Sequence, residues 1–353
     1  MTYRVIQWAT GGVGKAAIEA VLDHPQLELV GCWVHSEAKH GMDVGEIIGT
    51  GPMGVVATSN KADILALDAD CVVYTPLFPN EQEVIDLLSS GKSVVTSVGW
   101  VYPFDALDTQ PLDAACKTGN SALHGTGIHP GGMTERFPLT LSALTRGITH
   151  VRIDEYSDIR TYGAPDVVRD MMLFGHTPEA ARQSPMVKFM GTGFMQSIDM
   201  VAHELGFKLD ADKRTIHDIS VATAAIDSPI GIIEPGQVAG QKFTWEGLVN
   251  GEAVISASVC WLMGEEHLEE GWGFGPEGPR YEIAIQGDPD MSMTVHGCHP
   301  ASVEAGLLRN EGVVVTALHC VSAIPYVCAA GPGIKSYLDL PLISGRAAPH
   351  FQE

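Results

Sequence analysis

Three glycines close to the N-terminus are the first residues whose type and spacing could do chemistry. Gly11, Gly12 and Gly14 follow an apolar run at residues 3–8 and lead directly into a segment with helical periodicity. Between a strand and a helix, such glycines let the backbone approach a pyrophosphate, and the helix N-terminus supplies free N–H groups and a positive dipole. Written as G-x-G-x-x-G, the stretch carries Ala9 in the first position, so the motif alone would also suit a tight structural turn. Its place in the first strand-to-helix turn favours a dinucleotide cofactor.

The residues about 20 positions further on indicate which dinucleotide it is. An NAD enzyme usually places Asp or Glu there to bind the ribose 2′-hydroxyl group. This chain has His35 and Ser36, followed by Lys39, while Glu37 comes one or two positions late. These side chains can donate to a 2′-phosphate or neutralise it, whereas a carboxylate would repel it. NADP is therefore the expected cofactor and NAD a possible one, and the alternative is that these are ordinary solvated loop residues.

Further cofactor contacts are expected where later parallel strands end, because the carboxyl ends of such strands meet at one edge of the sheet. The complete set of predicted cofactor-binding residues is Thr10, Gly11, Gly12, Val13, Gly14, His35, Ser36, Lys39, Thr75, Pro76, Leu77, Thr96, Ser97, Gly127, His129 and Pro130.

The elements that must position these residues alternate along the first 130 residues. Short apolar runs predict strands at 3–8, 27–34, 54–57, 70–75, 93–97 and 121–126. Helical periodicity predicts helices at 13–23, 61–67, 80–89 and 108–118. Strands separated by helices indicate an α/β fold with a Rossmann-type parallel sheet.

After residue 132 the pattern changes to successive period-two segments. They lie at 150–160, 217–226, 241–249, 253–262, 281–286 and 291–296. Such segments predict an α+β second domain with a mixed or antiparallel sheet, interrupted by one helical insertion near 165–205. Residues 313–334 predict a C-terminal helix that returns to the first domain. The expected organisation is a dinucleotide-binding domain over 1–130, completed by 311–353, and a substrate-binding and dimerisation domain over 131–310.

The composition excludes several partners. The 353 residues include 21 Lys and Arg against 43 Asp and Glu, a formal net charge of −22, which repels nucleic acid and anionic lipid. No apolar run is expected to reach the roughly 18 residues that a membrane span needs. The N-terminus lacks the apolar region of a signal peptide, so a cytoplasmic protein is expected.

The cysteines and histidines predict no metal site. The seven cysteines are scattered and never form a C-x-x-C pair, which favours reduced thiols over a disulfide framework or a zinc site. His296, Cys298 and His299 form the only tight cluster that resembles a metal site. No second ligand pair of recognisable spacing accompanies them, so a structural role is favoured.

Several segments together resemble one enzyme superfamily. The stretches ATGGVGKAA, VVYTPLFP, GKSVVTS, GTGIHPGGMTERFPL and IPYVCAAGPGIKSYLDLPL are similar to the dihydrodipicolinate reductase-like superfamily, in the branch of 2,4-diaminopentanoate dehydrogenase and the native amine dehydrogenases. The resemblance is thinner over 165–310. It implies a Rossmann domain, a second domain that dimerises, and hydride transfer between NAD(P)H and a C=N carbon. The E-x-H-H and K-x-D-x-P-S-G-T signature of dihydrodipicolinate reductase itself is missing.

The resemblance also implies one carboxylate at the reacting centre. Such a group would deprotonate ammonium or the carbinolamine and stabilise the cationic iminium that accepts hydride. The family's glutamate just after the fifth strand is not evident, and the nearest acid there is Asp105. Glu135 matches the acidic position of the family's P-G-x-x-x-[DE]-x-[LF]-P stretch, and a nearby helix start should keep it ionised. Glu155, on a strand of the second domain, is the third candidate.

The expected substrate is small and hydrophobic. Residues 171–200 are rich in Met and Phe, which suits an adaptable apolar pocket, although helix core or a dimer contact explains the same composition. The leading prediction is an oxidoreductase that aminates small hydrophobic ketones or aldehydes with ammonia, or oxidises the matching amine. The alternatives are an NADPH-dependent carbonyl or C=C reductase, with Tyr102, Tyr156 or Tyr162 as the proton donor, and an NADP-binding protein without catalysis.

Overall fold

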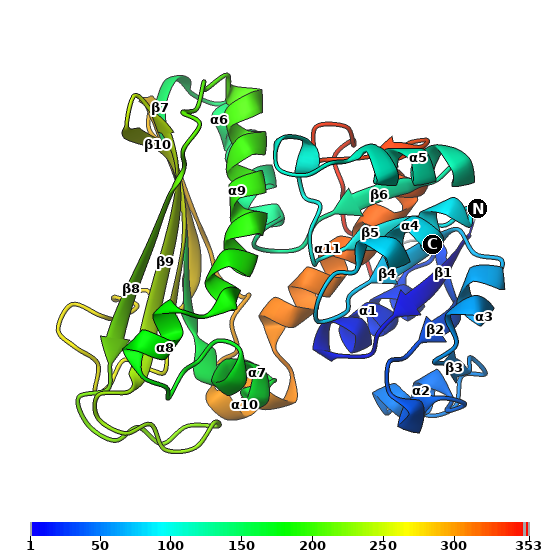
Figure 1. Ribbon diagram of the computed structural model, residues 1–353, viewed down its shortest axis with the longest axis horizontal. Coiled ribbons are helices and arrows are strands. Elements are labelled where there is room, and N and C mark those ends of the chain that lie inside the picture. The colour runs from blue at the N-terminus through cyan, green and yellow to red at the C-terminus, as the bar shows by residue number, and fades with distance from the viewer. Residues whose placement is uncertain (1, 349–350, 352–353) are drawn as a thin grey trace. The chain divides into compact units, whose positions relative to one another are not determined.

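The protein divides into two compact units. The computed structural model describes residues 2–348 and 351. Unit 1 comprises Met1–Ile128 and Val313–Glu353, and unit 2 comprises His129–Gly312 (Figure 1). The boundaries expected from the sequence lie two residues away from these.

Unit 1 is built on a seven-stranded parallel sheet with the order β13-β6-β5-β4-β1-β2-β3. Its strands are β1 (Tyr3–Trp8), β2 (Leu27–Trp33), β3 (Ala57–Thr58), β4 (Cys71–Tyr74), β5 (Ser93–Thr96), β6 (Ala122–Gly125) and β13 (Gly333–Ile334). Its helices are α1 (Gly12–Asp23), η1 (Glu37–Lys39), α2 (Val44–Ile48), α3 (Lys61–Ala66), α4 (Glu81–Ser89), η2 (Pro103–Asp105), α5 (Gln110–Gly119) and α11 (Glu311–Ala329). The strand order reverses between β1 and β4, which is where doubly wound sheets bind ligands. The predicted Rossmann-type parallel sheet is confirmed.

Helix α11 is the C-terminal helix expected from the sequence. It spans 19 residues and is long and apolar enough to cross a membrane by length and composition, so the expectation that no run reaches this length was wrong. Its buried side chains include Cys320, Val321 and Ile324, which join Ile18 and Val21 of α1 in one hydrophobic core cluster of unit 1. Core packing therefore accounts for the apolar character of α11.

Unit 2 is built on a six-stranded mixed sheet with the order β12-β11-β7-β10-β9-β8. Its strands are β7 (Arg146–Asp158), β8 (Arg214–Val221), β9 (Val238–Val249), β10 (Glu252–Leu262), β11 (Arg280–Asp288) and β12 (Met291–Val295). Its helices are η3 (Gly132–Arg136), α6 (Phe137–Ser142), η4 (Ile159–Thr161), α7 (Pro165–Asp170), α8 (Pro178–Arg182), α9 (Pro185–Leu205) and α10 (Val303–Leu308). Neighbouring strands run antiparallel except β7 and β10, which run parallel. The predicted mixed sheet is confirmed.

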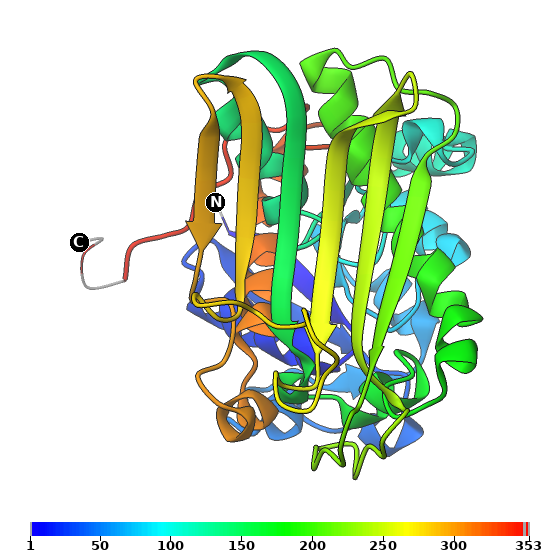
Figure 2. The same ribbon diagram turned by 90° about the vertical axis from the view of Figure 1, so that its left-hand side faces the viewer.

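The two faces of this sheet differ. Helix α9 packs on one face, where Phe194 stacks on Trp245 with 4.1 Å between ring centroids. Directly paired residues share a face, so the register gives one row on the α9 side, made of Phe243, Val259, Glu155 and Tyr281. The next row points to the opposite face and is made of Asp218, Lys242, Cys260, Tyr156 and Arg280. Figure 2 looks onto that opposite face, where the strands of unit 2 lie in front of its helices.

Candidate active site

The glycine turn after β1 has the geometry of a phosphate-binding turn. A Cβ atom on Gly14 would lie 2.2 Å from the carbonyl oxygen of Ala9, so α1 packs this close to the strand only because residue 14 is glycine. Gly11 and Gly12 are exposed, and no side chain caps the N-terminus of α1 within the described residues. The free N–H groups of this helix end form a site for an anionic group. Ala9 adopts a positive φ of 74°, a strained conformation at the position where the motif has glycine.

The end of β2 brings a positive charge to this turn. Lys39 Nζ donates a hydrogen bond of 2.9 Å to Thr10 Oγ1, so the ammonium group lies beside the glycine turn. His35 and Ser36 are exposed at the end of the same strand. The residues predicted to contact the ribose side of the cofactor are thus brought together in unit 1.

The later strand ends also meet at this edge of the parallel sheet. Gln7 Nε2 donates to the Ala9 carbonyl at 2.9 Å and to Thr75 Oγ1 at 2.8 Å, which ties the glycine turn to the end of β4. Thr96 is the last residue of β5 and Gly127 follows β6, and both residues are buried. Pro76 and Ser97 are half-buried, and Leu77 is exposed. The remaining two predicted cofactor residues, His129 and Pro130, belong to unit 2.

Glu155 is the centre of a hydrogen-bonded cluster on the α9 side of the sheet in unit 2. Its Oε1 atom accepts hydrogen bonds from Ser157 Oγ at 2.7 Å and from Trp261 Nε1 at 2.8 Å. Burial raises the pKa of Glu155, and hydrogen bonds from Ser157, Trp261 and Tyr281 oppose that rise. A carboxyl group with a raised pKa exchanges its proton closer to neutral pH, as a general acid or base must.

His129 lies on the other side of this carboxyl group. Its Nε2 atom is 3.9 Å from Glu155 Oε2, and its side chain is only 1% exposed. The ring packs edge-on against Phe194 and Tyr281, at centroid distances of 4.7 and 5.5 Å. Burial lowers the pKa of His129 to about 3, so the imidazole is neutral at physiological pH. Its Nδ1 atom is buried and has no hydrogen-bond partner within the described residues.

Glu135 has a different environment from the one expected. It is fully buried in η3, a π-helical turn, where Oε2 accepts the Gly131 N–H at 2.7 Å and Oε1 accepts from the Ser197 hydroxyl on α9. Burial raises its pKa to about 8. The expectation that a helix start keeps Glu135 ionised was therefore wrong, because desolvation outweighs the hydrogen bonds that favour the charged form. These bonds tie the 131–135 turn to α9.

The other candidate acid and the three candidate tyrosines have different environments. Asp105 is exposed in η2 of unit 1. Tyr102 is buried in unit 1, and Tyr156 points to the opposite face of the second sheet, where the Arg280 guanidinium lies 4.3 Å from its ring centroid. Only Tyr162 adjoins the cluster, since the Glu155 carboxylate contributes to the raised pKa of its phenol after burial.

The Met- and Phe-rich segment divides between core and cavity. Phe174 and Met200 are fully buried, in keeping with the core interpretation. Met172 and Met190 line a small cavity together with Phe243 and Trp261, the residue whose indole binds Glu155. An apolar hollow thus adjoins the Glu155 cluster in unit 2.

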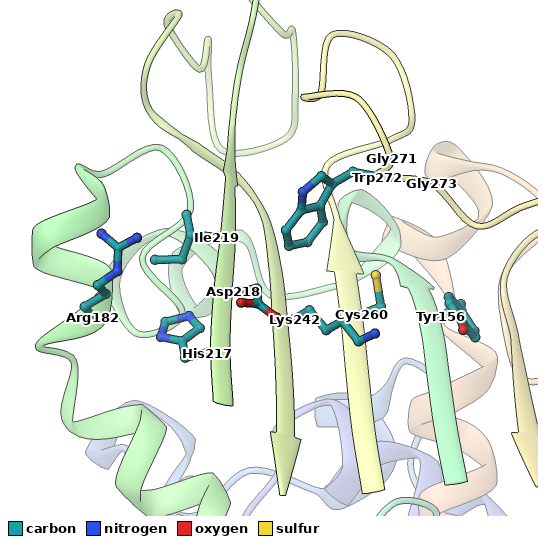
Figure 3. Close-up of a pocket in the computed structure, with 10 residues that line it drawn as sticks. All are labelled: Tyr156, Arg182, His217, Asp218, Ile219, Lys242, Cys260, Gly271, Trp272 and Gly273. Carbon is teal, nitrogen blue, oxygen red and sulfur yellow. The ribbon is translucent and has the colours of Figure 1, made fainter. Parts of the chain in front are cut away.

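A larger cavity on unit 2 is lined by Tyr156, one of the candidate proton donors, and by none of the candidate acids or predicted cofactor-binding residues. Its volume is about 650 Å³ and Figure 3 shows its lining, which includes Asp218, Lys242, Cys260, Tyr156 and Trp272. Most of these residues lie on the face opposite α9, whereas Glu155 points to the α9 side. The sheet therefore separates the larger cavity from the Glu155 carboxyl group.

Metal chemistry has no evident site in the described part of the chain. No group of three or more His, Cys, Asp or Glu side chains there is arranged to hold an ion. In the predicted 296–299 cluster, His296 is exposed and Cys298 is buried, while His299 Nε2 lies 2.9 Å from Ser157 Oγ.

Fold and site together define a two-unit oxidoreductase, and comparison with known proteins specifies the family. Residues 134–349 match the 2,4-diaminopentanoate dehydrogenase C-terminal domain, and residues 5–80 match the N-terminus of dihydrodipicolinate reductase. The chain belongs to the 2,4-diaminopentanoate dehydrogenase branch of the dihydrodipicolinate reductase-like enzymes.

Individual relatives can be aligned with nearly the whole chain. An amine dehydrogenase of Streptomyces virginiae is 29% identical over 352 residues, 96% of either chain. The 2,4-diaminopentanoate dehydrogenase of Acetoanaerobium sticklandii is 24% identical and covers 96% of this chain and 93% of its own. The solved structure of an amine dehydrogenase from Mycobacterium smegmatis shares the fold, with a TM-score of 0.77, 21% identity and 98% of each chain covered. The predicted family and the prediction of a nicotinamide-dependent amine dehydrogenase are confirmed.

Proposed function

We propose that the protein prefers NADP and interconverts a small hydrophobic ketone or aldehyde, with ammonia, and the corresponding primary amine. The bound cofactor would supply or accept the hydride. The chain's own residues would hold the cofactor at the glycine turn, enclose the apolar substrate and move the protons.

Glu155 is proposed as the acid and base of the reaction. In the amination direction its carboxylate would take a proton from ammonium, so that ammonia can attack the carbonyl carbon. It would then return a proton to the hydroxyl of the carbinolamine, which leaves as water and yields the iminium. The observation that carries this role is the cluster of Ser157, Trp261 and His129 around one buried carboxylate with a raised pKa. Asp105 is exposed, and Glu135 is engaged with the Gly131 backbone and Ser197.

The preference for NADP is supported by the end of β2. No carboxylate stands at 35 or 36 to bind a 2′-hydroxyl group, and Lys39 is held beside the glycine turn through Thr10. A 2′-phosphate in this position would gain a charge-assisted hydrogen bond from Lys39.

Assembly and location are further parts of the proposal. A homodimer through the second sheet is supported by the face opposite α9, which carries charged side chains that pair among themselves, Arg152 with Asp154 and Glu282. A sedimentation measurement should give twice the chain mass of 37.6 kDa. A cytoplasmic location is supported by the seven free cysteines, six of them buried.

Cofactor oxidation with and without ammonium tests the function. NADPH consumption is followed with cyclohexanone or a short aliphatic aldehyde at mildly alkaline pH, with NADH in parallel. Turnover that requires ammonium supports the proposal. Turnover that is indifferent to ammonium would indicate a carbonyl reductase, and cofactor binding without turnover would contradict catalysis on these substrates.

A further inference from the structure

The Glu155 cluster continues beyond the residues that surround the carboxyl group. Ser157 lies two positions further along β7 and therefore on the same face of the sheet. Its Oγ atom is 2.7 Å from Glu155 Oε1 and 2.9 Å from His299 Nε2. One hydroxyl group thus bridges the carboxylate and an imidazole from the segment that follows β12.

The hydrogen count on this bridge fixes the tautomer of His299. Ser157 has a single hydroxyl hydrogen, and it donates that hydrogen to Glu155. The contact with His299 therefore requires the Nε2–H group to donate to Ser157 Oγ. This leaves Nδ1 of the neutral ring as an acceptor, and that atom is buried without a partner within the described residues.

His299 also leads toward the surface. It is half-buried, its ring lies 5.3 Å from that of Tyr281, and it is three positions from the exposed His296. His296 Nε2 lies 3.8 Å from Glu277 Oε2, in a pair whose two side chains are more than half exposed. His296 also lowers the pKa of His299 through its charge, so the two imidazole rings lie within electrostatic range of one another.

We propose that Ser157 and His299 form a proton relay that connects Glu155 with the protein surface. This rests on the proposed role of Glu155. In the loading direction, the ring of the half-buried His299 turns toward solvent, where its Nδ1 atom binds a proton. After the ring has turned back, the Nε2–H proton passes to Ser157 Oγ. The hydroxyl proton of Ser157 then passes to Glu155 Oε1. Ser157 Oγ gains one proton and releases one, the imidazole ring gains one at Nδ1 and releases one at Nε2, and Glu155 keeps the proton that it receives. The ring then turns outward again, exchanges its proton with solvent and returns in its first tautomer.

The relay explains how a buried acid can turn over repeatedly. Reductive amination consumes a hydride and one proton in each cycle, and amine oxidation releases them. Glu155 gives the proton that it takes from ammonium to the leaving water, so the proton that the amine product takes up in each cycle must reach the site from solvent. His299 and Ser157 are accordingly positioning and relay residues, whereas Glu155 is the group proposed to touch the substrate.

Other titratable groups face the same region and belong in any interpretation of pH dependence. Those near the relay are His129, Tyr162, Tyr281, Cys298, His296 and Glu277. Burial, followed by the charge of His296, lowers the pKa of His299 to about 4, so its protonated form is transient at neutral pH. Burial raises the pKa values of Tyr162, Tyr281 and Cys298, and these groups remain neutral there.

The test compares His299→Gln, His299→Ala and Ser157→Ala with the wild-type enzyme in ammonium-dependent turnover. The Gln amide can still donate to Ser157 but cannot pass a proton. We expect each variant to lower kcat about tenfold or more, with KM within twofold, because proton transfer and not binding is impaired. Added imidazole should restore kcat of His299→Ala in proportion to its concentration and should leave His299→Gln unchanged.

A matched serine–histidine pair supplies the control. Ser256 Oγ lies 3.3 Å from His150 Nε2, in the same sheet but on the face opposite Glu155. Ser256→Ala and His150→Gln should keep the wild-type kcat. Wild-type kcat in His299→Gln, or a lower kcat in His299→Ala that imidazole does not restore, would overturn the relay. Glu155→Gln is measured in the same series. If kcat falls in Glu155→Gln but stays normal in the His299 variants, the relay alone is rejected. If Glu155→Gln keeps the wild-type kcat, the proposed role of Glu155 is rejected and the relay with it.

Discussion

Glu135 and Glu155 are both buried glutamates of unit 2 with raised pKa values, but their partners differ. Glu135 accepts from a backbone N–H four residues away and from Ser197 on the adjoining helix α9. Glu155 is surrounded by side chains of three strands and by His129, and its serine partner leads on to His299. A buried carboxyl group that completes a turn contributes to stability. A buried carboxyl group whose hydrogen-bond partner leads on to a side chain that can take up a proton, as Ser157 leads to His299, can transfer protons. The contrast teaches that burial and a raised pKa alone do not identify a catalytic acid.

Replacing Glu155 should produce the largest effect. Glu155→Gln preserves the size of the side chain and removes its ability to exchange a proton, so kcat should fall about 10²- to 10⁴-fold. The measurement is steady-state turnover in both directions, with circular dichroism to confirm that the variant is folded. A wild-type kcat in this variant would show that Glu155 has no catalytic role, and the contrast with Glu135 would then not hold.

Replacing Glu135 should instead lower the stability of the fold. Glu135→Ala leaves the Gly131 N–H and the Ser197 hydroxyl without their buried acceptor, which should lower the free energy of unfolding by about 2–3 kcal/mol. Urea denaturation measures this loss, and kcat per folded molecule should stay within about threefold. If Glu135→Ala keeps its stability but loses turnover, the two glutamates have been assigned the wrong way round.

The raised pKa of Glu135 gives this prediction a pH dependence. The pKa of Glu135 is about 8 in the folded protein against an ordinary value of 4.5, so between these values the unfolded chain binds fewer protons than the folded one. Stability should therefore fall as pH rises through this window and level off above it. From pH 6 to pH 8, wild type should lose about 2 kcal/mol relative to Glu135→Gln, which does not titrate. Parallel unfolding curves that keep a constant difference would show that this carboxyl group is not protonated in the fold.

The smallest effect on turnover is expected from replacing Lys39, the residue proposed to bind the 2′-phosphate of the cofactor. Lys39→Ala should lower kcat/KM for NADPH about five- to tenfold and leave NADH almost unchanged, because only the 2′-phosphate needs the ammonium group. The ratio of the two cofactors in steady-state assays is the readout, and Lys15, an exposed lysine of α1, offers a control through Lys15→Ala. An equal loss with both cofactors would mean that Lys39 supports the glycine turn and does not select NADP.

The parts of the fold that depend on neighbours in sequence could be predicted. Most strands and helices of the first unit were expected within a few residues because each has its own periodicity, and Gly14 was identified because its requirement is local. The prediction for residues 313–334 was wrong at its end, because α11 stops at Ala329 and Gly333–Ile334 form the two-residue strand β13, which is too short to show a period. The helix α2 (Val44–Ile48) was missed because five residues carry little periodicity.

The Glu155 cluster could not be predicted as a whole. A period-two pattern puts Glu155 and Ser157 on one face, but their partners Trp261, Tyr281 and His299 come from segments more than 100 residues later. Only the register, with β7 between β10 and β11, brings them together. The prediction that Glu135 is ionised was wrong for a related reason. It applied a rule about helix ends to a side chain whose environment is decided by packing against α9.

A single-turnover experiment tests the central claim most directly. Enzyme loaded with NADPH is mixed with the carbonyl substrate and ammonium, and the loss of reduced cofactor is followed in a stopped-flow instrument for wild type, Glu155→Gln and Glu135→Gln. The account predicts that Glu155→Gln slows the transient at least about 100-fold while Glu135→Gln stays within about threefold of wild type. A normal transient in Glu155→Gln, or a slow one in Glu135→Gln alone, would contradict it.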